Sequence, residues 1–413
     1  MKEKVKVPEL RFPGFTDDWE ERKLIDLATT YIGLVTTMTE NYTNKGTLLI
    51  RNSDIKEGRF DLSNPIYLEE QFAEENKTRR MRKGDVVTVH TGDIGTSAMI
   101  NNELEGAIGF ATITTRPTKE LDSNFLAWYF NSNYHKKYAK RMSTGDGRSN
   151  YNMKDFNKNV IPTPQIDEQQ KIGAFFKQLD DTIALHQHKL DLLKEQKKGF
   201  LQKMFPKNGA KVPELRFAGF ADAWEQRKLS DLMTFSNGIN APKENYGTGT
   251  KMISVMDILN PLPMKYDNIL NSVAVDKKIE DKNKVEKGDL IFVRSSEIVE
   301  EVGWAKAYKE DHYALYSGFA IRGKRISSYN AYFIELTLNY ANRKEIKRRA
   351  GGSTRFNVSQ EILNSLNVLT PSISEQNQID LFFTKIDDTI TLHQRKLDLL
   401  KEQKKGFLQK MFI

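Results

Sequence analysis

The feature that most constrains this chain is an internal repeat. Residues 7–27 read VPELRFPGFTDDWEERKLIDL and residues 212–232 read VPELRFAGFADAWEQRKLSDL, so 16 of 21 positions agree. Residues 180–205 and 387–412 agree at all but two of 26 positions, and both contain KLDLLKEQKKGFLQKMF. An offset of 205 to 207 residues is far longer than a solenoid repeat. We therefore expect two copies of one unit, each a globular domain followed by a long, nearly invariant segment.

The segments between these blocks also correspond, but loosely. KGD at 83–85 matches KGD at 287–289, GFA at 109–111 matches GFA at 318–320, and TGDGRSN at 144–150 aligns with GGSTRFN at 351–357. The offsets drift by only a few residues, as expected for one fold with loop insertions. The predicted boundaries are a first domain at 1–165, a long helix at 166–206, a second domain at 207–372 and a second long helix at 373–413.

The long segments show a heptad pattern. Apolar positions recur at steps of three and four residues, which is typical of a helix seam that packs on another helix. From residue 168 to 204 such a helix would be roughly 55 Å long. We expect the two seams of this chain to pair with each other in antiparallel fashion, which would give a pseudo-twofold axis; a homodimer through one seam is the alternative. The predicted seam residues are Phe176, Leu179, Ile183, Leu190, Leu193, Phe383, Ile386, Ile390, Leu397 and Leu400.

Each globular part mixes strand and helix patterns. The runs VVTVH at 86–90 and LIFVR at 290–294 are short and rich in β-branched residues, and each follows a Gly-Asp turn. Residues 124–138 and 332–349 have helical spacing and basic C-terminal ends. The predicted fold class is thus α+β, with two mixed α/β domains separated by a pair of long antiparallel, coiled-coil-like helices.

Composition narrows the possible functions. The chain has 413 residues and no cysteine, which excludes disulfides, zinc–thiolate sites and thiol catalysis. Its formal net charge of +8 is compatible with a polyanionic partner but does not require one. No apolar run approaches the length of a membrane span, and the N-terminus lacks a secretory h-region, so we expect a cytoplasmic protein.

The motifs of common catalytic sites are missing from the sequence. There is no GxxxxGK[ST] phosphate loop, and the six histidines form no HxxxH pair. The acidic pairs at 180–181 and 387–388 lie on the long helices, where we expect them to be solvated. We therefore predict no catalytic residue, no metal site and no cofactor bound by this chain.

Cations and amides recur instead at matching loops of the two copies. Contacts to phosphates and base edges need such groups on loops of a rigid frame. Helix capping is the alternative explanation for the basic helix ends, since cations and glycine favour helix C-termini, and a solvated surface is the alternative for the basic cluster around residue 80. The candidate DNA-contacting residues are Arg51, Asn52, Arg79, Arg80, Arg82, Thr91, Asp93, Lys140, Arg141, Arg148, Asn150, Arg294, Ser295, Ser296, Arg348, Arg349, Arg355 and Asn357.

Taken together, the VPELRF blocks, KGDVVTVHTGDIG, TGDGRSNYNMKDF and the two helices that begin with Pro-x-x-x-Glu-Gln resemble the specificity subunit of type I restriction–modification enzymes. The resemblance covers essentially the whole chain. It implies a non-catalytic subunit in which each of two target-recognition domains binds one half of a split, asymmetric site in double-stranded DNA. It further implies docking of two methyltransferase subunits, which use S-adenosylmethionine to methylate adenine. Restriction translocase–nuclease subunits, which use ATP and magnesium, would join the complex.

Two other functions are compatible with a duplicated basic chain. A stand-alone tandem DNA-binding regulator would bind a specific DNA tightly without any partner. A protein-binding scaffold would show no steep salt dependence of DNA affinity.

Overall fold

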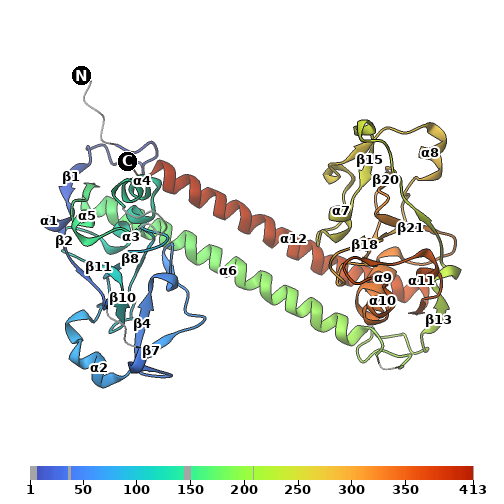
Figure 1. Ribbon diagram of the computed structural model, residues 1–413, viewed down its shortest axis with the longest axis horizontal. Helices are drawn as coiled ribbons and strands as arrows, with labels where there is room; N and C mark the ends of the chain where they lie inside the picture. The colour runs from blue at the N-terminus through green and yellow to red at the C-terminus, as the bar shows by residue number, and fades with distance from the viewer. Residues whose placement is uncertain (1–6, 36–38, 144–149, 208, 413) are drawn as a thin grey trace. The chain divides into compact units, whose positions relative to one another are not determined.

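The chain forms two compact units, each containing one globular domain and parts of both long helices. A computed structural model describes residues 7–35, 39–143, 150–207 and 209–412. The first unit comprises Met1–Gln187 and Arg395–Ile413, and the second comprises His188–Gln394 (Figure 1). The last segment of the sequence thus belongs to the same unit as the first domain.

The first unit is built on two four-stranded sheets. In the main sheet, the antiparallel strands follow the order β2 (Ala28–Ile32), β11 (Thr112–Pro117), β8 (Val86–Val89) and β9 (Ser97–Met99). The second sheet has the order β10 (Ile108–Phe110), β4 (Thr47–Arg51), β7 (Ile66–Leu68) and β3 (Tyr42–Thr43). Helix α3 (Ser123–Asn131) lies against β8 and β9, and its residues from Phe125 to Asn131 are all buried. The remaining elements are α1 (Leu24–Leu27), α2 (Glu70–Glu75), α4 (Asn133–Met142), α5 (Met153–Phe156), the hairpin β5 (Ile55–Lys56) and β6 (Arg59–Phe60), and the pair β1 (Glu20–Lys23) and β12 (Val160–Thr163).

The second unit repeats this plan with changes in the second sheet. Its main sheet has the order β14 (Met233–Asn237), β21 (Ala320–Arg325), β17 (Leu290–Val293) and β19 (Ala305–Ala307). Its second sheet has only three strands, β16 (Ser272–Val273), β15 (Tyr246–Ile253) and β20 (Leu315–Tyr316). The other elements are β13 (Glu225–Lys228), β18 (Ser295–Ser296), β22 (Phe356–Asn357), β23 (Asn367–Thr370), α7 (Val255–Leu259), α8 (Lys277–Lys282), α9 (Ala331–Leu336), α10 (Arg343–Arg349) and α11 (Gln360–Asn364).

The long helices are α6 (Ile166–Met204) and α12 (Ile373–Lys410), and they pack antiparallel within each unit. In the first unit, Phe175 contacts Phe407 edge to face at 4.9 Å, and Lys404 pairs with Asp180 at 2.6 Å. In the second unit, Phe382 contacts Phe200 at 4.9 Å, and Lys197 pairs with Asp387 at 2.6 Å. Each contact in one unit therefore recurs in the other with the two helices exchanged, which is the predicted pseudo-twofold internal repeat. The prediction that Asp180 and Asp387 are solvated was wrong, because each forms an ion pair with a lysine of the opposite helix.

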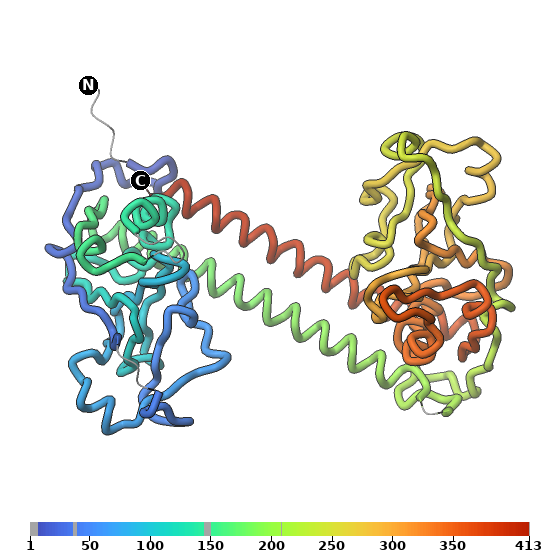
Figure 2. The backbone as a smooth tube through the Cα atoms, viewed as in Figure 1, coloured from blue at the N-terminus to red at the C-terminus, as the bar shows by residue number. Residues whose placement is uncertain are grey.

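The end of each long helix completes the core of the domain from the other repeat. Leu408, Met411 and Phe412 belong to the core of the first unit, with Trp19 and Phe125. In the second unit the same places are taken by the C-terminal end of α6, with Leu201, Met204 and Phe205. Figure 2 shows the red C-terminal end of α12 reaching the blue and green part of the first unit. Pairing within one chain, rather than a homodimer through one seam, accounts for this arrangement.

The start of each long helix is clamped to its own domain by the Glu-Gln pair of the sequence motif. Arg11 donates two hydrogen bonds to the buried Glu168 at 2.6 and 2.8 Å, and the same pairing joins Arg216 to Glu375. Gln169 accepts from the backbone N–H of Asp122, which caps α3. These hydrogen bonds explain why both copies contain the arginine of LRF near their start and the Glu-Gln pair at the start of the long helix.

The predicted seam residues are buried to different degrees. Phe176, Leu190, Phe383 and Leu397 are fully buried. The other six predicted seam residues are half-buried, namely Leu179, Ile183, Leu193, Ile386, Ile390 and Leu400.

The two helices expected within the domains are each interrupted. The first breaks at Ser132, whose hydroxyl accepts from the backbone N–H of His135 and so caps a new helix, α4. The second passes through a π-helical turn, Thr337–Ala341, before α10. Periodicity alone did not reveal either interruption, because both helices keep an apolar face across the break.

Within the described ranges, no helix is long and apolar enough to cross a membrane. Those residues also contain no group of three or more potential metal ligands.

Candidate nucleic-acid interface

In the first unit, the structure brings together the loops that carry Asn52, Thr91 and Asn150. The side chain of Asn52 donates to the carbonyl oxygen of Ala111 at 2.9 Å and accepts from the backbone N–H of His90, also at 2.9 Å. Thr91 forms a β-bridge with Asn150. Ala111 is the one described non-glycine residue with a positive φ, 49°. The two hydrogen bonds of the Asn52 side chain thus connect three loops next to the strained residue Ala111. The Asn52 amide therefore has a structural role.

Most of the charged side chains at these loops are paired internally. Arg51 donates to both carboxylate oxygens of Asp54 at 2.8 and 2.7 Å, which raises the pKa of Arg51. Asp93 accepts from the hydroxyl of Thr96 at 2.7 Å. Burial lowers the pKa of the half-buried His90, which favours the neutral form of the ring. The loops therefore offer a rigid, mostly neutral surface rather than a set of free cations.

The arginine cluster around residue 80 divides into two groups. Arg79 donates to the carbonyl oxygen of Ile32, and Arg80 pairs with Glu70 at 2.5 Å and donates to Thr47 at 3.1 Å. Arg82 is exposed and its side chain has no partner among the described residues. A free guanidinium can contact a phosphate without breaking an existing ion pair, so Arg82 is the better placed of the three.

The basic end of α4 also presents exposed cations. Lys140 and Arg141 are both exposed, and the Arg141 guanidinium lies 5.6 Å from the centre of the Tyr138 ring. Arg148, the arginine predicted to follow this helix, lies outside the described residues.

In the second unit, the candidate residues surround a small two-stranded sheet. β18 (Ser295–Ser296) pairs with β22 (Phe356–Asn357), so the loop after β17 lies beside the glycine loop after α10. The Nε of Arg355 donates to the hydroxyl of Ser295 at 3.0 Å, and its guanidinium lies 5.5 Å from the centre of the Phe319 ring. Arg294 donates to the carbonyl oxygen of Gly318 at 3.2 Å. Three loops distant in sequence therefore meet at Arg355.

The other candidates of the second unit contribute unequally. The hydroxyl of Ser296 donates to Glu301 at 2.6 Å, and the amide of Asn357 donates to the carbonyl oxygen of Arg355 at 3.2 Å. On α10, Arg349 pairs with Glu345 and Ser365, whereas Arg348 is exposed without a side-chain partner among the described residues. Arg348 and Arg355 are accordingly the cations best placed to reach a ligand.

Sequence reasoning missed an apolar component at this place. Phe319 and Ile298 are more than half exposed, and both line a shallow depression that also includes Arg355 and Ser295. In the sequence, Phe319 belongs to the GFA block that both copies share, which indicated a structural residue. Its aligned partner Phe110 is half-buried in the structure. Only the structure shows the ring at the surface beside an arginine, where it can contact a thymine methyl or a base face.

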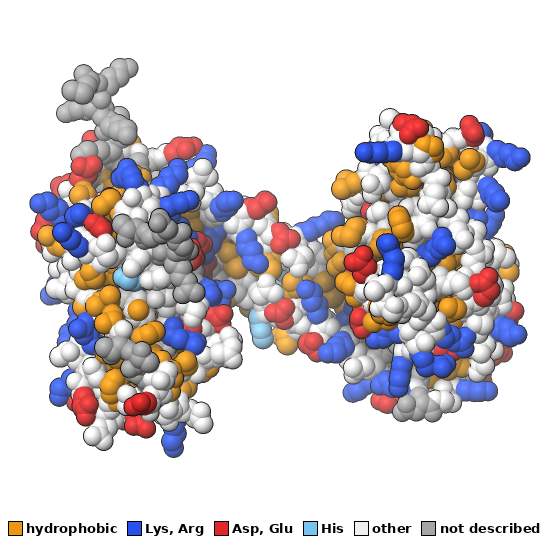
Figure 3. Space-filling model, viewed as in Figure 1, with side chains coloured by type: hydrophobic (Ala, Val, Ile, Leu, Met, Phe, Trp, Pro, Cys, Tyr) orange, Lys and Arg blue, Asp and Glu red, His pale blue; other side chains and the backbone are white. Residues whose placement is uncertain are grey.

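On the face shown in Figure 3, neither unit concentrates its charged side chains in one place. Figure 3 shows lysine and arginine side chains spread over the face in view of each unit, with acidic side chains among them. This distribution suits contacts from several loops to the backbone of DNA.

A duplicated frame with different loops at equivalent positions defines a class of two-domain recognition proteins. Comparison with known proteins identifies the class further. A family described as the type I restriction modification DNA specificity domain matches residues 16–195 and 221–402. The chain belongs to this family, whose members serve as non-catalytic DNA-recognition subunits of type I restriction–modification systems.

Relatives match over most of their length. The putative type I restriction enzyme MjaX specificity subunit of Methanocaldococcus jannaschii is 23% identical, with 95% of this chain and 92% of the relative covered. The type I restriction enzyme StySPI specificity subunit of Salmonella potsdam is also 23% identical, with 80% and 73% covered. Among solved structures, the S subunit of a type I restriction–modification system from M. genitalium superimposes with a TM-score of 0.64 at 14% identity, covering 98% of this chain and 99% of that one. At that identity the superposition establishes the shared fold alone.

Proposed function

We propose that this chain reads a bipartite, asymmetric DNA site, one half with each domain, and directs adenine methyltransferase and restriction subunits to it. The observation that carries the proposal is the contrast between the two copies. The helices and their clamps are nearly identical, whereas the loops at Asn52 and His90 differ in residue type from those at Ser254 and Arg294. Two domains with the same scaffold but different loop residues can recognise two different DNA half-sites.

The surfaces of the long helices support two equivalent docking sites for partners. Leu185 and Leu192 are exposed on α6, and Leu392 and Leu399 are exposed at the equivalent positions of α12. Residues seven apart lie on the same face of a helix. Each helix thus presents the same pair of exposed leucines, which is what two identical methyltransferase subunits would require.

The cofactors would belong to the partners. In the proposed complex, the methyltransferase subunits use S-adenosylmethionine and the restriction subunits use ATP and magnesium, while this chain binds none of the three. Its own contribution is the choice of DNA sequence and the distance between the two half-sites.

The decisive experiment is co-expression with a methyltransferase subunit of the type I family, followed by genome-wide sequencing of methyladenine. We expect a split adenine-methylated motif only when both proteins are present. A stand-alone regulator would instead bind DNA tightly without the methyltransferase. A protein scaffold would leave the genome unmethylated and would bind DNA without a steep salt dependence.

A domain exchange tests the division of labour. Replacing residues 30–160 with those of another member of the family should change one half of the motif and leave the other half as it was. The matched exchange of the second domain should change the opposite half. A change of both halves by either exchange would contradict the assignment of one half-site to each domain.

A further inference from the structure

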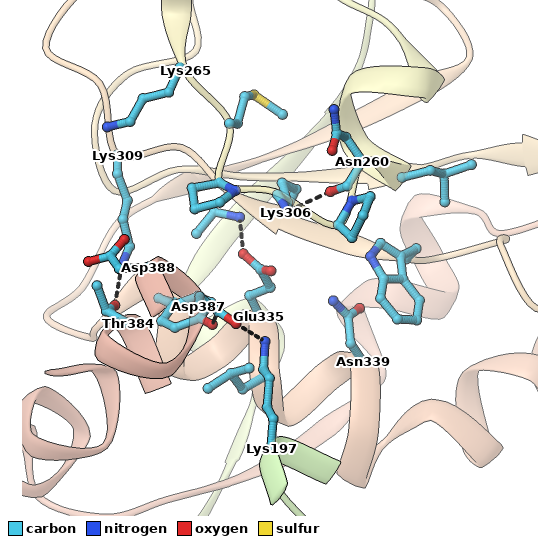
Figure 4. Close-up of a pocket in the computed structure, with 18 of the residues that line it drawn as sticks. Lys197, Asn260, Lys265, Lys306, Lys309, Glu335, Asn339, Thr384, Asp387 and Asp388 are labelled. Carbon is cyan, nitrogen blue, oxygen red and sulfur yellow. Dashed lines mark hydrogen bonds and ion pairs between the residues drawn. The ribbon is translucent and has the colours of Figure 1, made fainter. Parts of the chain in front are cut away.

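The second unit contains a cavity of about 410 Å³ that has no role in the proposed DNA reading. It lies between the loop that follows α7, strand β19, helix α9 and the part of α12 that carries Thr384 and Asp387 (Figure 4). Leu259, Pro261, Met264 and Leu336 supply apolar walls. Its volume and its mixture of apolar walls with a few polar groups are typical of small-molecule sites.

The equivalent place in the first unit is closed. There the hairpin β5–β6 brings Gly58 so close to Trp128 that an added Cβ would lie 2.4 Å from the indole. The backbone N–H of Gly58 donates to the carbonyl oxygen of Ser97 at 2.9 Å and fixes the hairpin on β9. In the second unit the corresponding stretch forms α7 and a proline-containing loop, and the cavity lies between this loop and β19.

The cavity also differs from its counterpart by a pair of charged residues. Asn131 bonds both backbone groups of Ser97, and Asn339 bonds both backbone groups of Ala305, which aligns β9 with β19 and α3 with α9. In this alignment Lys306 replaces Ala98 and Glu335 replaces Ala127. Two alanines of one repeat have thus become a lysine and a glutamate of the other.

These two charges are buried without pairing to each other. Lys306 and Glu335 are only 7% and 8% exposed, and no ion pair joins them among the described residues. The Lys306 ammonium donates to the carbonyl oxygen of Asn260 at 2.9 Å, and one oxygen of Glu335 accepts from the backbone N–H of Ala307 at 2.7 Å. Burial lowers the pKa of Lys306 and raises the pKa of Glu335. Burial of each charge is therefore costly, and a ligand that supplied both opposite charges would offset that cost.

Of the other charged groups that line the cavity, three lysines and Asp387 form ion pairs; Lys265 pairs with Glu310 at 3.2 Å. Lys197 pairs with Asp387, and Lys309 pairs with Asp380 at 2.9 Å. The second oxygen of Glu335 has no hydrogen-bond partner among the described residues, and the Lys306 ammonium has one. Figure 4 shows Lys306 and Glu335 on neighbouring elements that face the same space.

We propose that this cavity binds a free amino acid with an apolar side chain, whose carboxylate pairs with Lys306 and whose ammonium pairs with Glu335. The side chain of the ligand lies against Leu259, Met264 and Leu336. Pro261, Pro263 and Lys265 are exposed around the cavity and form its mouth. Among the described residues, the second unit alone has this site, because the first unit has two alanines and a closing hairpin in its place.

Titration of the full-length chain with L-leucine, L-methionine and L-phenylalanine, followed calorimetrically, tests the proposal. We expect at least one of them to bind, and its analogues without the carboxylate or without the amine to bind at least tenfold more weakly. For leucine these analogues are isopentylamine and isocaproate. Failure of all three amino acids to bind at millimolar concentration would overturn the proposal, as would equal binding of the analogues.

Variants locate the site. Lys306→Ala and Glu335→Ala should each lower the affinity at least tenfold, whereas Lys282→Ala, an exposed position on α8, should leave it unchanged. The double variant Lys306→Ala/Glu335→Ala restores the alanine pair of the first unit and should remain folded while losing binding. Retained binding in the folded double variant would refute the site. Methylation by the complete complex is measured separately, so failure here leaves the proposed DNA function untouched.

Discussion

Replacement of Phe412 by alanine should destabilise the first unit, although this residue follows the end of α12. Phe412 is 5% exposed, and its ring centre lies 5.8 Å from that of Phe125 and 5.9 Å from that of Phe176. Removal of a buried phenylalanine side chain typically costs about 3–5 kcal/mol. Because the variant loses contacts to α3 and to the start of α6, we expect the loss to fall on the whole unit rather than on the end of α12.

Hydrogen exchange measured by mass spectrometry can separate these outcomes. A loss of about 3 kcal/mol in the opening of the first unit raises the exchange of its most protected amides by roughly two orders of magnitude. We expect this rise in α3 and β8 of the first unit, with α9 and β17 unchanged. The variant Phe205→Ala, at the equivalent position of the other repeat, should show the reverse pattern.

Leu399→Ala is the matched control, because Leu399 lies on the same helix but is more than half exposed. Its effect should stay within about 0.5 kcal/mol, as for most surface substitutions. Faster exchange confined to the last turn of α12 in Phe412→Ala would refute the reasoning. It would mean that the stability of the first unit does not depend on the packing of Phe412.

Three further predictions follow from the contacts described. A chain of residues 1–207 should form a homodimer by light scattering, because its Leu201, Met204 and Phe205 are the same residue types as Leu408, Met411 and Phe412; a folded monomer would contradict this. Glu335→Gln should be more stable than the unmodified chain at neutral pH in urea denaturation. Burial raises the folded-state pKa of Glu335, so its contribution is most favourable below the ordinary value of 4.5 and is lost as the pH rises through the raised value. The advantage of the variant should therefore vanish on acidification towards pH 4, and an advantage that grew on acidification would contradict the sign; the neighbouring charges of Lys306, Lys197 and Lys309 reduce its size. Arg355→Ala should weaken reading of the second half-site by about 1–3 kcal/mol if the contact to guanine is bidentate, measured by methyladenine sequencing, and unaltered methylation would remove Arg355 from the interface.

Much of the architecture could be predicted from the sequence, because it depends on local and repeated signals. The nearly constant offset between the two copies predicted one fold present twice. The spacing of apolar residues by three and four positions predicted long helices, each with an apolar seam. The pattern also indicated that the second seam was in the same chain. Both predictions depend on the periodicity of the sequence, which is independent of where the neighbouring segments lie in the fold.

The tertiary structure decided which residues are free to act. Arg51, Arg79, Arg80 and Arg349 look equivalent to Arg82 and Arg348 in sequence, but the side chain of each of the first four has a hydrogen-bond partner. Asp54 and Glu345 are close along the chain to Arg51 and Arg349, whereas Ile32 is distant from Arg79. Pairing depends on distances of a few ångströms between segments up to tens of residues apart, which composition does not encode.

The sequence by itself determined the duplication, and with it the two frames and the two matched helices. Only the tertiary structure showed that each helix ends in the core of the domain from the other repeat. It also showed that a pair of alanines in one repeat corresponds to buried, unpaired charges in the other. The physical reason is that near-identity of sequence specifies equal helices, while the packing of side chains against distant segments decides what each copy encloses.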